Sequence, residues 1–134
     1  MLIINNKTFL IYGFGLSGKS SFDFLIKNNK IKIFDDSKKN ISKKYKKYSI
    51  SKSILNNIIF DYIIISPGID INNCSIKNFL NQNKNKLITE LDIFYVAYTN
   101  NKKIAVTGTN GKSTTCKLIY EILKNSKKDV RLVG

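Results

Sequence analysis

Residues 12–21 read YGFGLSGKSS, and this stretch decides the fold because it fits two phosphate-binding patterns at once. Gly13, Gly15 and Gly18 make the G-x-G-x-x-G of a dinucleotide-binding loop. Gly13 and Gly18, with the Lys-Ser pair that follows them, also make the G-x-x-x-x-G-K-[ST] of a nucleoside-triphosphate loop. The sequence on either side has to decide between the two patterns.

The neighbouring segments favour the dinucleotide pattern. FLIYG (9–13) and IKIFD (31–35) are apolar runs typical of buried strands, and residues 17–29 between them carry apolar side chains at helical spacing. Asp35 ends the second run, 20 positions after the middle glycine, where a dinucleotide fold has a carboxylate that accepts a hydrogen bond from the nucleoside. We therefore interpret Lys19 as solvent-facing or as an auxiliary phosphate contact.

Apolar runs continue to alternate with helical stretches further along the chain. The predicted strands are 61–66 and 86–89, and the predicted helices are 53–58, a segment with Ile76, Phe79 and Leu80, and 90–98. Repeated strand, helix, strand predicts an α/β fold: a Rossmann-like parallel sheet with helices on both faces.

The polar stretch TNNKK (99–103) is the predicted boundary between a first domain, 1–98, and a second, 99–134. The elements predicted after it are the strand IAVTG (104–108), a helix at 112–124 and the strand DVRLVG (129–134). This is one strand-loop-helix-strand unit, which cannot cover both faces of a parallel sheet by itself. We therefore expect the second domain to be incomplete.

The composition is strongly basic but does not identify a partner. The net charge is +14, and 22 of the 23 basic residues are lysine. The chain also has 22 Ile and 17 Asn, the bias expected of an AT-rich coding sequence. A sequence selected for phosphate contacts would contain more arginine, because the planar guanidinium group donates two hydrogen bonds to one phosphate. We therefore interpret the run at 38–48, with six Lys and two Tyr, as a solvated loop and not as a nucleic-acid patch.

Cys74 and Cys116 match no disulfide framework and no zinc-site spacing. Reduced thiols are typical of cytosolic proteins. The longest apolar runs fall far below the roughly 20 residues that span a bilayer. We expect a cytoplasmic protein with no membrane partner and no nucleic-acid partner.

A second glycine loop, VTGTNGKSTT (106–115), has two residues between its glycines where the triphosphate pattern has four. Its parts still suit phosphate: backbone amides at a helix start, a lysine and adjacent hydroxyls. From spacing alone, a structural turn and a triphosphate site are equally supported.

These motifs resemble a known family. VTGTNGKSTT resembles the ATP loop of the Mur ligases, which add amino acids to the peptidoglycan precursor, and of the related folylpolyglutamate synthases. The latter typically have glycine after the lysine, whereas this chain has serine and threonine. GFGLSG (13–18), SPGI (66–69) and ELDIF (90–94) resemble, in the same order, the N-terminal domain of the D-glutamate-adding branch of the Mur ligases.

The resemblance implies a Rossmann-like domain that binds UDP, followed by the start of a P-loop-type ATP-binding domain. The implied UDP-binding residues are Gly13, Gly15, Leu16, Ser17, Gly18, Asp35, Asp36 and Ser66. The implied ATP-binding residues are Gly108, Thr109, Asn110, Gly111, Lys112, Ser113 and Thr114. Lys112 would be catalytic by stabilising charge on the transferred phosphoryl group, and Ser113 would help to hold Mg²⁺. Asp36 departs from the family, which more often has a neutral hydroxyl there.

The implied reaction uses ATP and Mg²⁺ as cofactors and UDP-N-acetylmuramoyl-L-alanine as the substrate. ATP phosphorylates the alanyl carboxylate, and the amine of D-glutamate attacks the acyl phosphate. The C-terminal domain that brings in D-glutamate lies beyond residue 134. We therefore expect the 134 residues to bind the UDP substrate but to be inactive alone, unless a complementary chain supplies the rest.

Two other functions stay open on the sequence. A stand-alone nucleotide-binding module would use YGFGLSGKSS for an NAD-type ligand, although SPGI and the second glycine loop argue against it. A basic nucleic-acid-binding protein is supported by net charge alone, and a steep salt dependence of binding would be its signature.

Overall fold

Four parallel strands form a sheet around the central strand β1 (Thr8–Tyr12) in the computed structural model, which describes residues 3–133. The strand order is β2-β1-β3-β4, with β2 at Lys30–Phe34, β3 at Tyr62–Ile65 and β4 at Leu87–Ile88. Phe9 of β1 pairs with Ile31 on one side and with Tyr62 on the other. The predicted parallel sheet is confirmed, and all four strands predicted for it contribute.

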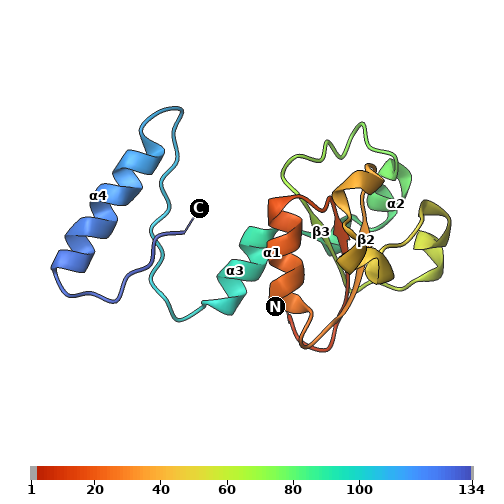
Figure 1. Ribbon diagram of the computed structural model, residues 1–134, viewed down its shortest axis with the longest axis horizontal. Helices are drawn as coiled ribbons and strands as arrows, with labels where there is room; N and C mark the ends of the chain where they lie inside the picture. Colours follow the sequence, from red (N-terminus) through yellow and green to blue (C-terminus); the bar gives the residue numbers. More distant parts are fainter. Residues whose placement is uncertain (1–2, 134) are drawn as a thin grey trace. The chain divides into compact units, whose positions relative to one another are not determined.

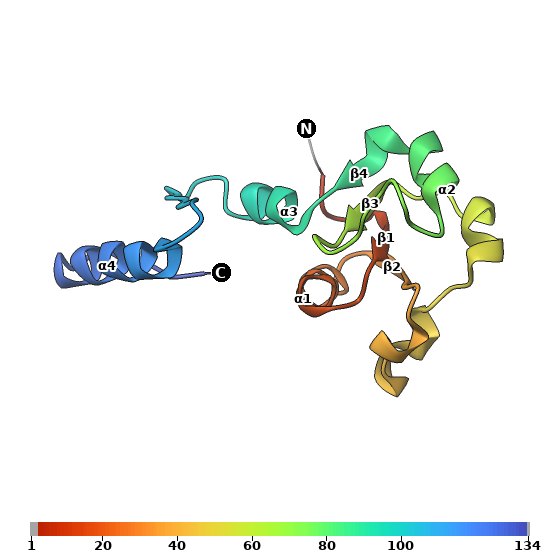
Figure 2. The same ribbon diagram turned by 90° about the horizontal axis from the view of Figure 1, so that it is seen from above.

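Helices cover both faces of this sheet (Figures 1 and 2). Side chains alternate along β1, so that Phe9 and Ile11 join one apolar cluster while Leu10 and Tyr12 join another. The first cluster includes residues of α1 (Leu16–Leu25) and α3 (Glu90–Ala97), and the second includes residues of the 3-10 helix η3 (Lys52–Asn57) and of α2 (Lys77–Gln82). The predicted two-sided α/β arrangement is therefore confirmed.

Helix α1 ends earlier than the predicted range 17–29, and the Asn29 side chain bonds the carbonyl group of its last residue. The Asn29 amide nitrogen donates to the carbonyl oxygen of Leu25 at 2.8 Å and to that of Ile4 at 2.9 Å. This amide closes the helix and ties the turn to the segment before β1. Sequence periodicity does not contain such a tertiary contact.

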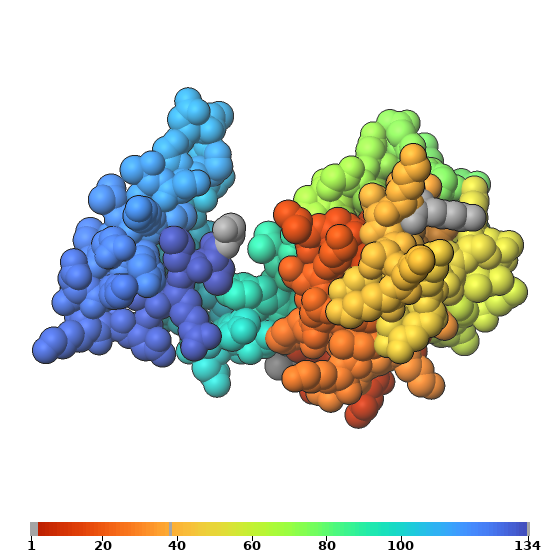
Figure 3. Space-filling view, in the orientation of Figure 1, coloured from red at the N-terminus to blue at the C-terminus, as the bar shows by residue number. Residues whose placement is uncertain are grey.

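The lysine-rich run is not the simple solvated loop that its composition predicts. Residues 38–48 form the 3-10 helices η1 (Lys38–Asn40) and η2 (Lys43–Tyr48). The Tyr45 ring is buried, with its centroid 5.1 Å from that of Phe22 in α1. Figure 3 shows η2 beside α1 on this face of the first unit, coloured orange to yellow. The run is held in place because its tyrosines pack inward, while Lys43, Lys44, Lys46 and Lys47 are exposed to water.

The chain divides into two units, Met1–Thr99 and Asn100–Gly134. In the second, α4 (Lys112–Asn125) forms as predicted. The strands predicted at 104–108 and 129–134 are wrong for every described residue, since 104–108 and 129–133 carry no β-ladder; residue 134 lies outside the described residues. A strand needs a neighbour for its backbone groups, and neither segment has one. None of residues 100–133 is fully buried.

Within residues 3–133, no helix is both long enough and apolar enough to cross a membrane. The two cysteines are free thiols, one in each unit, and both are half-buried.

An ion pair at the start of the sheet makes stability pH-dependent. Asp61 accepts a hydrogen bond from the Thr8 amide at 2.8 Å and pairs with the Lys7 ammonium at 3.1 Å. The Thr8 amide first, and Lys7 second, hold the pKa of Asp61 below its usual value. Asp61 therefore contributes stability above its usual pKa and loses it as the pH falls through the lowered folded value.

We expect Asp61→Asn to lower the free energy of unfolding at neutral pH by less than about 1 kcal/mol, because the carboxylate is partly exposed. Urea unfolding of both proteins between acidic and neutral pH measures this. The two stability curves should converge as the pH falls. Curves that stay parallel across that range would contradict the linkage.

Candidate functional site

The first glycine loop joins the carboxyl ends of three strands. Gly13 follows β1 with a φ of 88°, a backbone conformation that favours glycine. Its amide donates to the carbonyl of Phe34 at the end of β2 at 3.0 Å. The Ser66 hydroxyl, which follows β3, donates to the carbonyl of Gly13 at 2.7 Å. The predicted site residues Gly13 and Ser66 are thus brought together at one edge of the sheet.

The three glycines of the loop have different surroundings. A Cβ atom on Gly18 would lie 2.1 Å from the carbonyl oxygen of Gly13, so α1 packs directly on the loop. A Cβ atom on Gly13 would lie 2.8 Å from Cβ of Ser66. A Cβ atom on Gly15 would meet nothing within 4 Å. The lack of a side chain at Gly13 and Gly18 lets Ser66 and α1 pack closely on the loop, whereas Gly15 leaves the backbone open to an approaching ligand.

The start of α1 presents unpaired backbone amides beside Gly15. Gly15 is the N-cap, no side chain caps the helix, and its first turn has no acidic residue. The first amides of a helix have no partner within the helix and carry partial positive charge. Leu16 is exposed and Ser17 is half-buried at this end. The arrangement suits an anion.

The loop stands at the switch point of the sheet. The chain passes from β1 to β2 on one side and then returns to β3 on the other side of β1. Open α/β sheets bind ligands outside the carboxyl ends of the strands at this point. A cavity of about 300 Å³ adjoins it and is lined by Ile65, Ser66, Pro67, Ile69, Ile71, Leu87, Ile88, Thr89 and Asp92.

Asp35 holds the glycine loop in place. Its carboxylate accepts hydrogen bonds from the amide of Phe14 at 2.6 Å and the amide of Ser37 at 2.8 Å. The Asn40 side-chain amide donates to it at 3.0 Å. A carboxylate has about four acceptor positions, so these contacts leave part of its capacity for a ligand.

Asp36 faces two hydroxyl groups. The Tyr12 hydroxyl donates to one of its oxygens at 2.5 Å, and the Ser75 hydroxyl donates to the other. Burial first, and then the hydrogen bond to Asp36, raise the pKa of Tyr12 well above its usual value, so the phenol stays protonated as a donor. Sequence reasoning missed both partners, and the one available signal was a tyrosine at the end of a buried strand.

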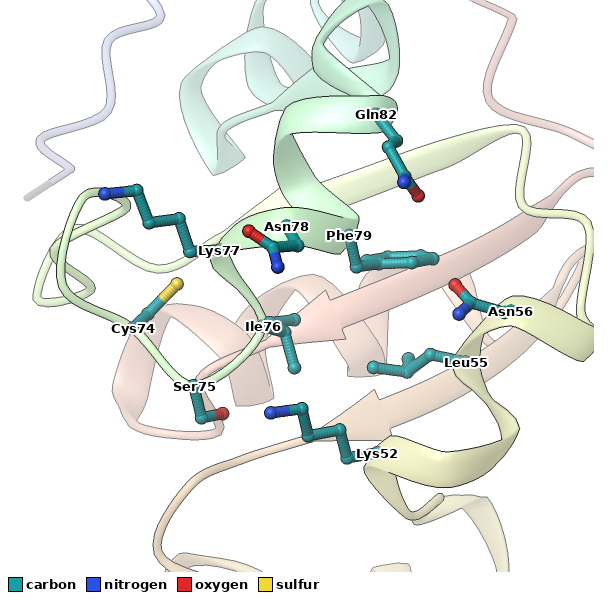
Figure 4. A pocket seen from close by; sticks show the side chains of 10 residues that line it. All are labelled: Lys52, Leu55, Asn56, Cys74, Ser75, Ile76, Lys77, Asn78, Phe79 and Gln82. Carbon is teal, nitrogen blue, oxygen red and sulfur yellow. The ribbon is translucent and has the colours of Figure 1, made fainter.

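Another cavity, of about 350 Å³, lies between η3 and the start of α2 (Figure 4). Its lining consists of Lys52, Leu55, Asn56, Cys74, Ser75, Ile76, Lys77, Asn78, Phe79 and Gln82. Lysine and asparagine are so common in this chain that such a lining carries little information. Neither the first glycine loop nor Ser66, which donates to that loop, lines this cavity, so it is not the candidate site.

The second glycine loop is exposed throughout, from Gly108 to Thr114. Gly111 has a φ of 76° and is the N-cap of α4, which no side chain caps. The Lys112 ammonium donates to the carbonyl oxygens of Gly108 and Thr109. The lysine therefore folds back on its own loop and would have to leave these carbonyls to reach a phosphate. Asn110, Ser113 and Thr114 lie in the same loop and first turn.

Among residues 3–133, no three His, Cys, Asp or Glu side chains gather in a way that could hold a metal ion. Ser113, the predicted magnesium ligand, offers a single hydroxyl at the first turn of α4. Mg²⁺ requires about six oxygen ligands, several of them usually water and phosphate. The Ser113 hydroxyl would therefore fill one position of such a site.

Comparison with known proteins identifies relatives of this chain, although no family model matches it. UDP-N-acetylmuramoylalanine--D-glutamate ligases of Francisella tularensis subspecies tularensis, holarctica and novicida are each 36% identical to it over 127 residues. The match covers 93% of this chain but only 28% of each relative. The predicted resemblance to the Mur ligases is therefore confirmed: over nearly its whole length this chain is similar to part of a UDP-N-acetylmuramoylalanine--D-glutamate ligase.

Proposed function

We propose that the first unit binds the uridine diphosphate portion of UDP-N-acetylmuramoyl-L-alanine, as part of a ligase that adds D-glutamate in peptidoglycan synthesis. One observation carries the proposal. The open space over Gly15 adjoins the uncapped start of α1 at the switch point of the sheet. Amides and a helix N-terminus in that position suit a diphosphate.

The proposed contacts follow from this placement. The diphosphate would lie over Gly15 and meet the amides of Leu16 and Ser17 at the start of α1, while Gly13 and Gly18 keep the loop tight. The N–H and O–H groups of uracil and ribose would donate to the acceptor positions of Asp35 that the protein leaves free. They would also contact Ser66. Lys19, half-buried in the first turn of α1, is an auxiliary contact in this proposal.

The second unit is proposed as the start of the ATP site. The amides at the start of α4 would hold phosphates, and Lys112 would turn from the carbonyls of Gly108 and Thr109 toward them. ATP would supply the phosphoryl group that activates the alanyl carboxylate. Ser113 would be one ligand of the accompanying Mg²⁺, and the remaining ligands would come from phosphate, water and other parts of the enzyme.

The activity of the whole ligase needs more than these residues supply. The proposed site for D-glutamate lies in the part of the relatives that this chain does not match, which is most of their length. A complementary chain or a continuation of this one would have to provide it. A cytoplasmic location belongs to the same proposal, since the proposed substrates are soluble nucleotides.

Ligand-dependent unfolding tests the proposal. UDP-N-acetylmuramoyl-L-alanine, ATP with Mg²⁺, and NAD are added separately to purified residues 1–134, with uridine as a matched control that lacks the diphosphate. A specific ligand at 100 times its Kd adds about 2.7 kcal/mol, which raises the Tm of a domain of this size by several degrees. We expect this shift with the UDP compound and not with uridine or NAD.

A shift with NAD and none with the UDP compound would replace the proposal by the stand-alone dinucleotide module. Equal shifts with uridine and with the UDP compound would remove the diphosphate from the site at Gly15.

A further inference from the structure

We propose that Asp36 is a positioning residue of the first unit, which fastens the segment 66–76 to the ends of β1 and β2 and does not itself contact the nucleotide. The consequence for ligand binding rests on the proposed function. The fastening itself is a property of the first unit and can be measured without a ligand.

The contacts of Asp36 join three parts of the chain. Asp36 follows β2, and one of its carboxylate oxygens accepts from the hydroxyl of Tyr12, the fully buried last residue of β1, at 2.5 Å. The other oxygen accepts from the hydroxyl of Ser75, which is 39 positions further along the chain. Figure 4 shows Ser75 on the loop that leads into α2. Hydrogen bonds to a charged acceptor are stronger than those between neutral groups.

The segment 66–76 carries part of the candidate site. Its first residue, Ser66, donates to the carbonyl of Gly13 at 2.7 Å. Its middle is held by local hydrogen bonds, such as those that Asp70 accepts from the Asn72 amide at 2.9 Å and the Asn73 side chain at 2.7 Å. Ser66 at one end and Ser75 at the other therefore tie the segment to the sheet through side-chain hydroxyls.

Charge favours this role over ligand contact. A carboxylate that lies beside a diphosphate repels it, because both groups are negative. Each oxygen of the exposed Asp36 carboxylate already accepts a hydroxyl hydrogen bond from the protein, which holds the charge against Tyr12 and Ser75. These contacts also explain why an acidic residue suits this position in a chain that contains Tyr12 and Ser75.

The test compares Asp36→Ala, Ser75→Ala and the double variant, with Ser53→Ala as a matched loss of a hydroxyl. Ser53 pairs with Ser51 on η3 at 2.8 Å and has no hydrogen bond to Asp36. Hydrogen exchange of the amides at 68–75 is measured without ligand, and the affinity for UDP is measured by calorimetry.

We expect each single variant to speed exchange in the segment and to weaken UDP binding, by roughly fivefold for Ser75→Ala, which loses one hydrogen bond, and by roughly tenfold for Asp36→Ala, which loses two. The double variant should be no worse than Asp36→Ala alone, because both changes remove the same link. Asp36→Asn should restore part of the affinity, since its amide oxygen still accepts one hydroxyl. Ser53→Ala should change neither readout.

A loss of affinity in Asp36→Ala with none in Ser75→Ala would show direct ligand contact and overturn the proposal. Tighter UDP binding by Asp36→Ala, or unchanged exchange at 68–75 in both variants, would overturn it as well. If the unaltered protein binds no UDP, the proposed function fails, and the exchange data alone then decide whether Asp36 fastens the segment.

Discussion

Gly18→Ala should unfold the first unit or leave it barely stable. The added Cβ atom would lie 2.1 Å from the Gly13 carbonyl oxygen and 3.3 Å from a methyl carbon of Ile11. Neither the strand end nor the helix backbone can move aside without separating α1 from the sheet. We expect a loss of more than about 3 kcal/mol, at the upper end of the range for overpacked sites. Circular dichroism during urea unfolding measures the change.

Gly15→Ala is the matched control, because it makes the same change three positions earlier in the same loop. Its Cβ atom would meet nothing within 4 Å, and the φ of Gly15 is -75°, which alanine adopts freely. Stability should stay within about 0.5 kcal/mol of the unaltered protein. UDP affinity should fall, since the methyl group occupies the space proposed for the diphosphate. A stable Gly18→Ala protein would mean that α1 does not pack on the loop as closely as described.

The sequence predicts the sheet well because its strands are short apolar runs that alternate with helices, and such a pattern is local. The loop glycines are predictable for the same reason: a tight turn between a strand and a helix requires them at fixed spacing. The same spacing predicts the position of the Asp35 carboxylate, but it does not predict which groups that carboxylate contacts. The nucleoside contact of Asp35 stays a prediction, and the hydrogen bond from the Phe14 amide of the loop is one that the sequence does not predict.

What the sequence does not predict depends on distant contacts. Ser75 meets Asp36 across 39 positions, and no local pattern marks that pairing. The strands predicted at 104–108 and 129–134 have the right residues, but the described segments 104–108 and 129–133 have no neighbouring strand, and strand formation depends on the neighbour. The run at 38–48 is predicted as a solvated loop because lysines dominate its composition, although Tyr45 decides its structure.

Phe22→Ala should destabilise the first unit by about 3–5 kcal/mol and release the lysine-rich run. Phe22 is nearly fully buried on α1, and its ring centroid lies 5.1 Å from that of Tyr45 and 4.8 Å from that of Tyr48. It also meets Phe14 of the glycine loop, with the centroids 5.9 Å apart. Removal of the ring leaves a cavity at the centre of this aromatic cluster, so η2 loses its main contact with α1.

Phe24→Ala is the control, because Phe24 lies two positions away on the same helix but is 48% exposed. It should cost less than about 1 kcal/mol. Urea unfolding gives the stability of both variants, and hydrogen exchange at the amides of 43–48 reports on η2. In Phe22→Ala these amides should exchange much faster than those of β1, whereas in Phe24→Ala they should keep their protection. Equal protection of 43–48 in both variants would mean that the lysine-rich run is held by other contacts, and the aromatic cluster would then account for stability but not for the order of that run.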